Sequence, residues 1–369
     1  MRVTTVVAAR PNFVKMAPIV RALSDRDGVD VRVVHTGQHY DTALSGSFLD
    51  QLGMPAPDEN LEVGSGSHAE QTARVMIGIE RSLSVHPTDA LVVAGDVNST
   101  MAAALAAAKL GVPIVHVESG LRSRDWSMPE EINRVVTDRV SDLLLCTSED
   151  AVENLVKEGI AGPGVVLVGN TMIDSLWRLI DVARASSPLA SLGLQPRAYL
   201  LVTLHRPALV DDPRSLGAVL EALDRLASEL PVVFPIHPRT RARLEQLPAR
   251  ADHLQLLAPV TYLEFLALQA SARLVVTDSG GVQEETSALG VPCLTYRTST
   301  ERPITLELGT NRLVGTDPAR LLSACQEELA TERQFSPAPI PLWDGHAGER
   351  AATAIHRAFG AVRRPVDAS

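Results

Sequence analysis

The chain contains 369 residues, of which 45% are hydrophobic and 21% are charged, and this balance excludes a disordered protein. At roughly 150 residues per domain, the length indicates about two domains that each bury a core. The formal net charge of −10 argues against a general nucleic-acid surface, and the longest apolar stretches are far shorter than the ~18 residues of a membrane span.

The N-terminal segment and the cysteines indicate the cellular compartment. The first ten residues form a short apolar run and then a basic loop, without the hydrophobic region or cleavage site of a signal peptide. Cys146, Cys293 and Cys325 are odd in number and have no CxxC spacing, so they predict neither a disulfide framework nor a zinc site. We therefore expect a cytoplasmic protein without a bound metal.

Apolar, β-branched runs alternate with helical patterns in the first half of the chain. Asp41 marks a helix start, Ser67 to Glu70 has the spacing of a capping box, and Gly111 follows an alanine-rich run as a stop signal. Alternation of this kind predicts a parallel sheet covered by helices on both faces. The expected strands are Val3–Ala9, Val31–Thr36, Ala90–Gly95, Val112–Val117, Asp142–Thr147 and Val165–Val168.

The same pattern resumes after a connector rich in proline, serine and glycine at residues 186–197. Helix starts are indicated at Asp212 and Thr261, and residues 346–362 predict a final helix. We therefore expect an α/β protein with two Rossmann-like, doubly wound domains at residues 1–185 and 186–345, and a C-terminal segment, 346–369, that packs back on the first domain. The expected strands are Tyr199–Thr203, Val232–Ile236, Leu254–Leu257, Leu274–Thr277 and Val291–Thr295.

Ligands of doubly wound sheets bind outside the carboxyl ends of the strands, so the residues that follow each strand are the functional candidates. After the first strand, Arg10 and Lys15 stand where a dinucleotide-binding protein carries the motif GxGxxG. Two cations beside a helix N-terminus can bind an anion. A solvated basic loop without a ligand is an equally good interpretation. Asp96 and Glu118 follow later strands, and Glu130 opens a helix. A helix cap is the commoner role for any one of these acids, but their convergence on one rim favours acid–base chemistry.

Residues after the strands of the second half suggest a diphosphate site. His205 and His237 each follow a strand, where a buried, hydrogen-bonded histidine is the default interpretation. The strand that ends at residue 277 leads into a Ser-Gly-Gly turn that opens a helix, so backbone amides and the helix dipole can hold a diphosphate. Glu285 stands one turn into this helix, in reach of ribose hydroxyls, and Arg302 and Arg312 can supply further cations. The turn consists of Ser279, Gly280 and Gly281.

Short motifs along the chain, from residue 1 to about residue 315, form one ordered set. They are RP and KMAP (residues 10–18), TGQH (36–39), GD (95–96), HVE with GLR (116–122), PEE (129–131), VGNT (168–171), HR (205–206), DSGG with QEE (278–285) and TERP (300–303). Together they resemble the non-hydrolysing UDP-N-acetylglucosamine 2-epimerases. The resemblance implies the GT-B fold, in which two domains face a cleft, a homodimer, and interconversion of UDP-N-acetylglucosamine with UDP-N-acetylmannosamine for cell-surface polysaccharides.

The resemblance also implies roles for individual residues. The implied catalytic residues are Asp96, Glu118, Glu130 and His205. The implied substrate-binding residues are Arg10 and Lys15, Phe265 beside the uracil, Ser279, Gly280, Gly281 and Arg312 at the diphosphate, and Glu285 at the ribose. In bacterial members a second molecule of UDP-N-acetylglucosamine binds as an activator, and the positions that resemble its site are Gln38, His39, Gln71, Arg206 and His237.

The sequence departs from the commoner family pattern at three places. Ala208 and Leu209 replace a usual Glu-Asn pair after His-Arg, Val260 stands where a glutamine often lies near the base, and the loop between Glu118 and Glu130 is shortened. These departures leave a 2-epimerase of a UDP-diacetamido uronic acid as an alternative. Two further alternatives are a glycosyltransferase, which shares the GT-B fold and the nucleotide-binding half, and a non-catalytic sugar-nucleotide sensor.

Carbon 2 of an N-acetylhexosamine carries no acidic proton because no carbonyl adjoins it. Its inversion therefore needs either an oxidation or a temporary alkene. Since the nicotinamide fingerprint is absent, the family route of eliminating and re-adding UDP is the expected one, without any cofactor. Two acid–base groups on opposite faces of the sugar are then required, and which carboxylate takes which role stays open.

Overall fold

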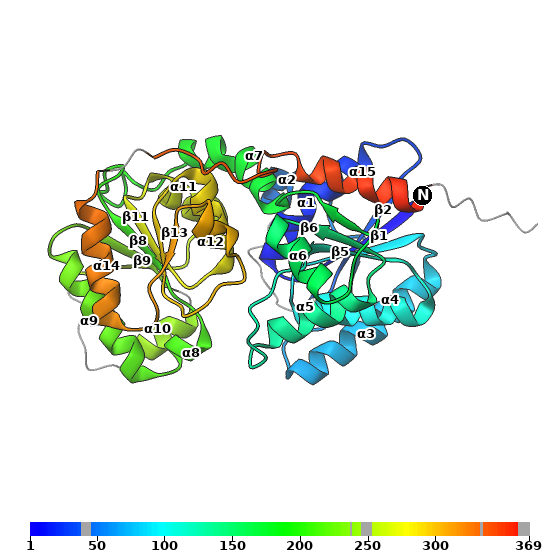
Figure 1. Ribbon diagram of the computed structural model, residues 1–369, viewed down its shortest axis with the longest axis horizontal. Helices are drawn as coiled ribbons and strands as arrows, with labels where there is room; N and C mark the ends of the chain where they lie inside the picture. Colours follow the sequence, from blue (N-terminus) through cyan, green and yellow to red (C-terminus); the bar gives the residue numbers. More distant parts are fainter. Residues whose placement is uncertain (38–45, 237, 245–252, 333–334, 361–369) are drawn as a thin grey trace, which may run out of the picture. The chain divides into compact units, whose positions relative to one another are not determined.

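The computed structural model describes residues 1–37, 46–236, 238–244, 253–332 and 335–360 of the chain, which divides into two compact units (Figure 1). Unit 1 comprises Met1–Arg178 and Pro341–Ser369, and unit 2 comprises Leu179–Ile340. The boundaries expected from the sequence, after residues 185 and 345, lie a few residues further along the chain than these divisions.

Unit 1 is built on a seven-stranded sheet in which every pairing is parallel, in the order β3-β2-β1-β4-β5-β6-β7. The short strand β3 was not expected from the sequence, because two residues carry no periodicity. The strands are β1 (Arg2–Val7), β2 (Asp30–His35), β3 (Glu59–Asn60), β4 (Ala90–Ala94), β5 (Ile114–Ser119), β6 (Leu143–Cys146) and β7 (Val165–Leu167).

Several helices of unit 1 begin and end at the expected signals, whereas the helix start expected at Asp41 lies outside the described residues. The capping box at Ser67 forms, with the serine hydroxyl accepting from the Glu70 amide, and Gly111 ends its helix in the left-handed conformation. Helix α15 packs against α1 (Figure 1), so the C-terminal helix belongs to unit 1. The helices are α1 (Arg10–Ser24), α2 (Gly46–Leu52), α3 (His68–Val85), α4 (Asn98–Leu110), α5 (Pro129–Val140), α6 (Glu149–Lys157), α7 (Thr171–Ala185), which continues into unit 2, and α15 (Ala347–Phe359).

Unit 2 repeats the architecture with a six-stranded parallel sheet in the order β10-β9-β8-β11-β12-β13. Strand β13 was not expected, because its polar sequence gives no apolar run. The strands are β8 (Leu200–Thr203), β9 (Val232–Pro235), β10 (Gln255–Leu257), β11 (Leu274–Thr277), β12 (Cys293–Thr295) and β13 (Asn311–Leu313). The helices are α8 (Pro207–Val210), α9 (Pro213–Ala227), α10 (Pro238–Leu244), α11 (Tyr262–Ser271), α12 (Gly280–Leu289), α13 (Ile304–Glu307) and α14 (Pro318–Ala330).

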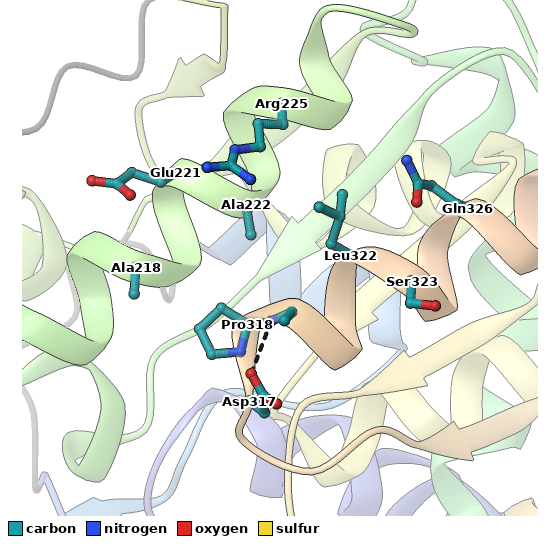
Figure 2. Close-up of a pocket in the computed structure, with 10 residues that line it drawn as sticks. Ala218, Glu221, Ala222, Arg225, Asp317, Pro318, Leu322, Ser323 and Gln326 are labelled. Atoms are coloured by element: carbon teal, nitrogen blue, oxygen red, sulfur yellow. Dashed lines mark hydrogen bonds between the residues drawn. The ribbon is translucent and has the colours of Figure 1, made fainter.

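Each unit has its own apolar core between the sheet and its helices. In unit 1 the buried faces of α3 and α4 cover β1, β2 and β4, and in unit 2 those of α9 and α14 cover β8, β9 and β11. Helices α9 and α14 lie side by side over a pocket of about 420 Å³, and no candidate site residue lines it (Figure 2). The three cysteines are buried and free. Within the described ranges, no helix is both long and apolar enough to cross a bilayer.

Candidate active site

The strand order of unit 1 reverses between β1 and β4, and candidate residues follow both strands. Lys15, in the second turn of α1, forms an ion pair with Glu118 near the end of β5, and both side chains are largely buried. A Cβ atom on Gly95 would lie 3.1 Å from the Lys15 Nζ atom, so the glycine after β4 leaves room for this ammonium. The structure thus brings Lys15 and Glu118 together as the sequence predicts. Arg10 begins α1, but its side chain lies outside the described part of the chain.

Glu118 has an unusual backbone conformation. Its φ is 65°, in the left-handed region that a non-glycine residue adopts at a cost of about 1–3 kcal/mol. The pairing register between β5 and β6 shifts between Val117 and Ser119, so the strand bulges at this carboxylate. Strain of this kind clusters at functional sites, because the surrounding structure must hold the residue in place.

Asp96, in the loop after β4, is fixed by helix α5. The guanidinium of Arg134 donates to Asp96 Oδ2 from Nε at 3.1 Å and from Nη2 at 2.7 Å, and the Asn133 amide donates to the Asp96 carbonyl at 2.8 Å. Arg134 is itself buried and donates to Glu131 at 2.7 Å. Asp96 is therefore an anchored carboxylate with about a quarter of its side chain exposed.

A buried network lies beneath these loops. The Asp138 carboxylate accepts from His116 Nδ1 at 2.6 Å and from the Gly120 amide at 3.1 Å, and it pairs with Arg122 Nη1 at 2.7 Å. The other ring nitrogen of His116 lies 2.9 Å from the Gly95 carbonyl oxygen, so both nitrogens face acceptors. Burial acts to raise the pKa of Asp138, but His116 and Arg122 outweigh it and lower that pKa. These contacts connect Gly95, in the loop after β4, with His116 and Gly120, which lie on either side of Glu118 in the sequence.

Glu130 differs from the other acids of unit 1. It lies exposed in the first turn of α5, whereas its neighbour Glu131 is buried and accepts hydrogen bonds from the amides of Ser123 and Arg124. The buried Glu131 therefore shapes the short loop before α5. Glu130 faces solvent in unit 1 and is available to a ligand.

In unit 2 the strand order reverses between β8 and β11, and His205 and Asp278 follow these two strands. His205 Nδ1 lies 3.0 Å from Asp278 Oδ1, while Asp278 Oδ2 accepts from the amides of His205 at 2.9 Å and Arg206 at 2.8 Å. The His205 side chain is 52% exposed, so the ring has Nδ1 beside the buried carboxylate while about half of its surface meets solvent. Burial acts to raise the pKa of Asp278, but these contacts lower it.

The Ser-Gly-Gly turn forms the start of α12 as expected, with Ser279 as its N-cap. A Cβ atom on Gly280 would lie 2.4 Å from Arg302 Nη1, so the absence of a side chain lets this guanidinium lie directly against the turn. Arg302 is buried, with Nε 3.0 Å from Glu284 Oε1 and Nη1 3.5 Å from Glu301 Oε2. The turn thus combines helix amides with a cation, a suitable arrangement for an anion.

Arg312 is the other candidate cation of unit 2. It stands on the edge strand β13, and its guanidinium donates to Glu327 on α14 at 2.8 Å with about half of both side chains exposed. In the described residues Arg312 therefore pairs with α14, and the arginine that lies against the turn is Arg302. The assignment of Arg312 to the diphosphate stays a prediction, and Arg302 is a second candidate cation.

Glu285 is buried in α12, and its Oε1 accepts from the Tyr262 hydroxyl of α11 at 2.8 Å. Burial raises the pKa of Glu285 to about 7. Burial and the neighbouring Glu285 also raise the pKa of Tyr262. Phe265 lies half-buried in the same helix as Tyr262, three residues further on.

The positions that resemble an activator site are only partly described. Gln38, His39 and His237 lie outside the described residues. Gln71 is buried in α3 and accepts from Asn98 Nδ2 at 3.0 Å. Arg206 donates from Nε to the Asp278 carbonyl at 3.0 Å, next to His205.

Several residues of these clusters were missed by the sequence analysis. Glu131, Arg134 and Asp138 are three, four and seven residues apart on α5, so they share one helix face, and charges spaced in this way were a usable signal. Tyr262 lies within an expected capping box, but nothing in the sequence pairs it with Glu285, 23 residues away. Asp278 belongs to the DSGG motif, but the sequence predicted no role for it.

The sequence of this chain is similar to those of known sugar-nucleotide epimerases along most of its length. The family model described as UDP-N-acetylglucosamine 2-epimerase matches residues 21–356. A UDP-N-acetylglucosamine 2-epimerase of Methanocaldococcus jannaschii is 39% identical over 360 residues, covering 95% of this chain and 97% of the relative. A UDP-2,3-diacetamido-2,3-dideoxy-D-glucuronate 2-epimerase of Pseudomonas aeruginosa is 41% identical over 333 residues, covering 89% and 92%.

The fold is also similar to that of solved structures. The crystal structure of the Methanocaldococcus jannaschii UDP-GlcNAc 2-epimerase in complex with UDP-GlcNAc and UDP superposes with a TM-score of 0.88 at 38% identity, covering 97% of this chain and 100% of that one. The expected class, an α/β protein of the GT-B type with two Rossmann-like units, is thereby confirmed.

Proposed function

Because the chain belongs to the UDP-N-acetylglucosamine 2-epimerase family, we propose that it interconverts UDP-N-acetylglucosamine and UDP-N-acetylmannosamine by inverting carbon 2. The observation that carries this proposal is the strained Glu118 carboxylate, paired with Lys15 at the carboxyl edge of the unit 1 sheet. Such a fixed, charged group beside a cation is suited to proton transfer on a bound sugar.

The proposed reaction is an elimination followed by an addition. The carbon 1–oxygen bond breaks and its electron pair leaves with the diphosphate, while a base takes the carbon 2 proton and the electrons of that C–H bond form the alkene. Reprotonation from the other face and re-addition of UDP complete the inversion. Two acid–base groups are needed, and we assign them among Asp96, Glu118, Glu130 and His205.

Stabilisation of the departing diphosphate is expected to be the largest catalytic contribution. We assign this role to the Ser279, Gly280 and Gly281 turn at the start of α12 and to Arg302, whose guanidinium lies against Gly280. Arg312, which the resemblance implies at the diphosphate, is proposed as a further contact of the same group. The ammonium of Lys15 is assigned to the substrate as well, as is Arg10.

Deuterated water tests the reaction directly. During turnover of UDP-N-acetylglucosamine, deuterium is expected at carbon 2 of the product, because the proton taken up differs from the proton removed. NMR spectroscopy of the sugar measures both the isotope and the configuration at carbon 2. An inverted product that keeps its original proton, or the absence of any inverted product, would refute the elimination route.

A second substrate is favoured by one comparison. The Pseudomonas aeruginosa relative is named for a diacetamido glucuronate substrate and is 41% identical to this chain. We therefore propose the corresponding UDP-diacetamido uronic acid as the alternative substrate of the same site. The ratio of kcat/KM for the two UDP-sugars decides between them, and a value below one for UDP-N-acetylglucosamine would overturn the first assignment.

Ribose binding by Glu285 predicts a pH dependence of affinity. A carboxylate accepts hydrogen bonds from two hydroxyls only when it is ionised, and the pKa of Glu285 is about 7. Lowering the pH from 8 to 5.5 protonates most of this carboxylate. Binding of UDP-N-acetylglucosamine is therefore expected to weaken by up to about 30-fold. Titration calorimetry at each pH measures this. The Glu285→Gln variant is the control, because its affinity should not change with pH; an equal slope in both proteins would contradict the assignment.

The raised pKa of Glu285 has a second consequence, for stability. Between about pH 4.5 and 7 the folded protein binds this proton more tightly than the unfolded chain does. The contribution of Glu285 to stability therefore falls as the pH rises through this range. Without ligand, Glu285→Gln should remove this part of the pH dependence.

The proposal also covers the oligomeric state of the protein and its activation by substrate. We propose a cytoplasmic homodimer that serves cell-surface polysaccharide synthesis and binds a second UDP-N-acetylglucosamine as an activator at Gln38, His39, Gln71, Arg206 and His237. Light scattering measures the oligomeric state. Reverse-reaction rates with and without added UDP-N-acetylglucosamine test the activation.

A further inference from the structure

We propose that Asp278 is the positioning residue of His205: its carboxylate keeps the imidazole proton on Nδ1 and leaves Nε2 as the atom that exchanges protons with the sugar. This inference rests on the proposed role of His205 in proton transfer and adds the residue and the ring atom through which that role is performed.

The two carboxylate oxygens of Asp278 contact different groups. Oδ2 accepts from the backbone amides of His205 and Arg206 at 2.9 and 2.8 Å, which fixes the plane of the carboxylate. Oδ1 lies 3.0 Å from His205 Nδ1 as an ion-pair contact, and in the part of the chain that the structure describes this buried oxygen accepts no hydrogen bond. The imidazole is therefore the nearest group that can supply a proton to it. Asp278 is 1% exposed, whereas half of the His205 side chain is exposed. The imidazole therefore has a buried anion beside Nδ1 and solvent over about half of its surface.

The chemistry follows from the hydrogen-bonding capacities of these groups. An ionised carboxylate only accepts hydrogen bonds, and a neutral imidazole carries one N–H. Of the two neutral tautomers, the one with its N–H on Nδ1 places that proton toward the buried carboxylate and leaves the lone pair on Nε2 to take up a proton. When Nε2 is protonated, the adjacent carboxylate stabilises the imidazolium. Because Asp278 precedes Ser279, the same residue also sets the distance between His205 and the diphosphate turn.

The Asp278→Asn variant tests this assignment with little change of shape. The two backbone amides require an oxygen at the Oδ2 position, so the new NH2 group will face His205 Nδ1 and force the ring proton onto Nε2. We expect kcat to fall by about 10²- to 10⁴-fold, while KM and the affinity for UDP change less than about threefold. Nitrogen-15 NMR of histidine-labelled protein at about pH 9, assigned with the His205→Gln variant, reports the tautomer independently of activity.

A matched control is available in the same unit. Asp317 accepts from the Ala319 amide at 2.9 Å as the N-cap of α14, so Asp317→Asn alters a capping carboxylate without a histidine partner. This variant should keep both the His205 tautomer and kcat.

Three results would overturn the inference: an Nδ1–H tautomer that persists in Asp278→Asn, an inverted tautomer with unchanged kcat, or a loss of UDP affinity as large as the loss of kcat. If the wild-type protein leaves no deuterium at carbon 2, the proposed function fails. In that case the NMR comparison still decides whether Asp278 sets the His205 tautomer.

Discussion

Replacing Glu118 by glutamine is expected to lower kcat by about 10²- to 10⁴-fold, the range typical of acid–base groups. The amide has nearly the same shape but cannot take up a proton, and it cannot neutralise the Lys15 ammonium with which Glu118 pairs. Affinity for UDP should change little, because the proposed nucleotide site is in unit 2. Steady-state turnover of UDP-N-acetylglucosamine and calorimetric titration with UDP measure the two effects separately.

A control variant shows whether the fall in kcat of Glu118→Gln comes from the loss of any ion pair or from the loss of this carboxylate. Glu153 pairs with Lys157 on α6 at 3.1 Å, with about two thirds of both side chains exposed, so Glu153→Gln removes an ion pair without touching the site. It should leave kcat unchanged. Glu118→Asp keeps the charge but withdraws it by one methylene, and we expect an intermediate loss. A folded Glu118→Gln protein with turnover within about tenfold of the wild type would remove Glu118 from the catalytic set.

The parallel sheets were predictable because each strand is a short apolar run and each helix start carries a local signal. Ser67 and Asp212 cap their helices with their own side chains, so the information lies within four residues. The grouping of candidate residues also follows from local information together with one topological rule. Lys15 and Asp96 in unit 1, and His205 and Ser279 in unit 2, follow the strands between which the strand order reverses, as the rule for doubly wound sheets requires.

What could not be predicted depends on contacts between distant residues. Asp96 and Arg134 are 38 residues apart, and His205 and Asp278 are 73 residues apart, so no periodicity links them. The left-handed backbone of Glu118 has no sequence signal either, since glutamate rarely adopts it and only the surrounding network holds it there. Strand β13, which carries Arg312, was not predicted either, because its polar sequence gives no apolar run.

Asp138→Asn is expected to destabilise unit 1 by about 3–5 kcal/mol, because it leaves the buried Arg122 guanidinium without the buried anion that it shares with His116. Asp138 pairs with His116 and Arg122, all three nearly inaccessible to solvent. The three tryptophans, Trp126, Trp177 and Trp343, all lie in unit 1, so urea unfolding followed by tryptophan fluorescence reports this unit alone.

Glu158→Gln is the matched control for this prediction. It removes the other carboxylate of Arg122, which is 32% exposed, and should cost less than about 1 kcal/mol. Because the pKa of Asp138 is lowered in the folded state, its stabilising contribution is present above its ordinary pKa of 3.8 and is lost as the pH falls below it. The difference between wild type and Asp138→Asn should therefore narrow in acid. Equal losses for the two variants would contradict the view that this buried carboxylate, rather than the exposed one, holds the Glu118 loop in its strained conformation.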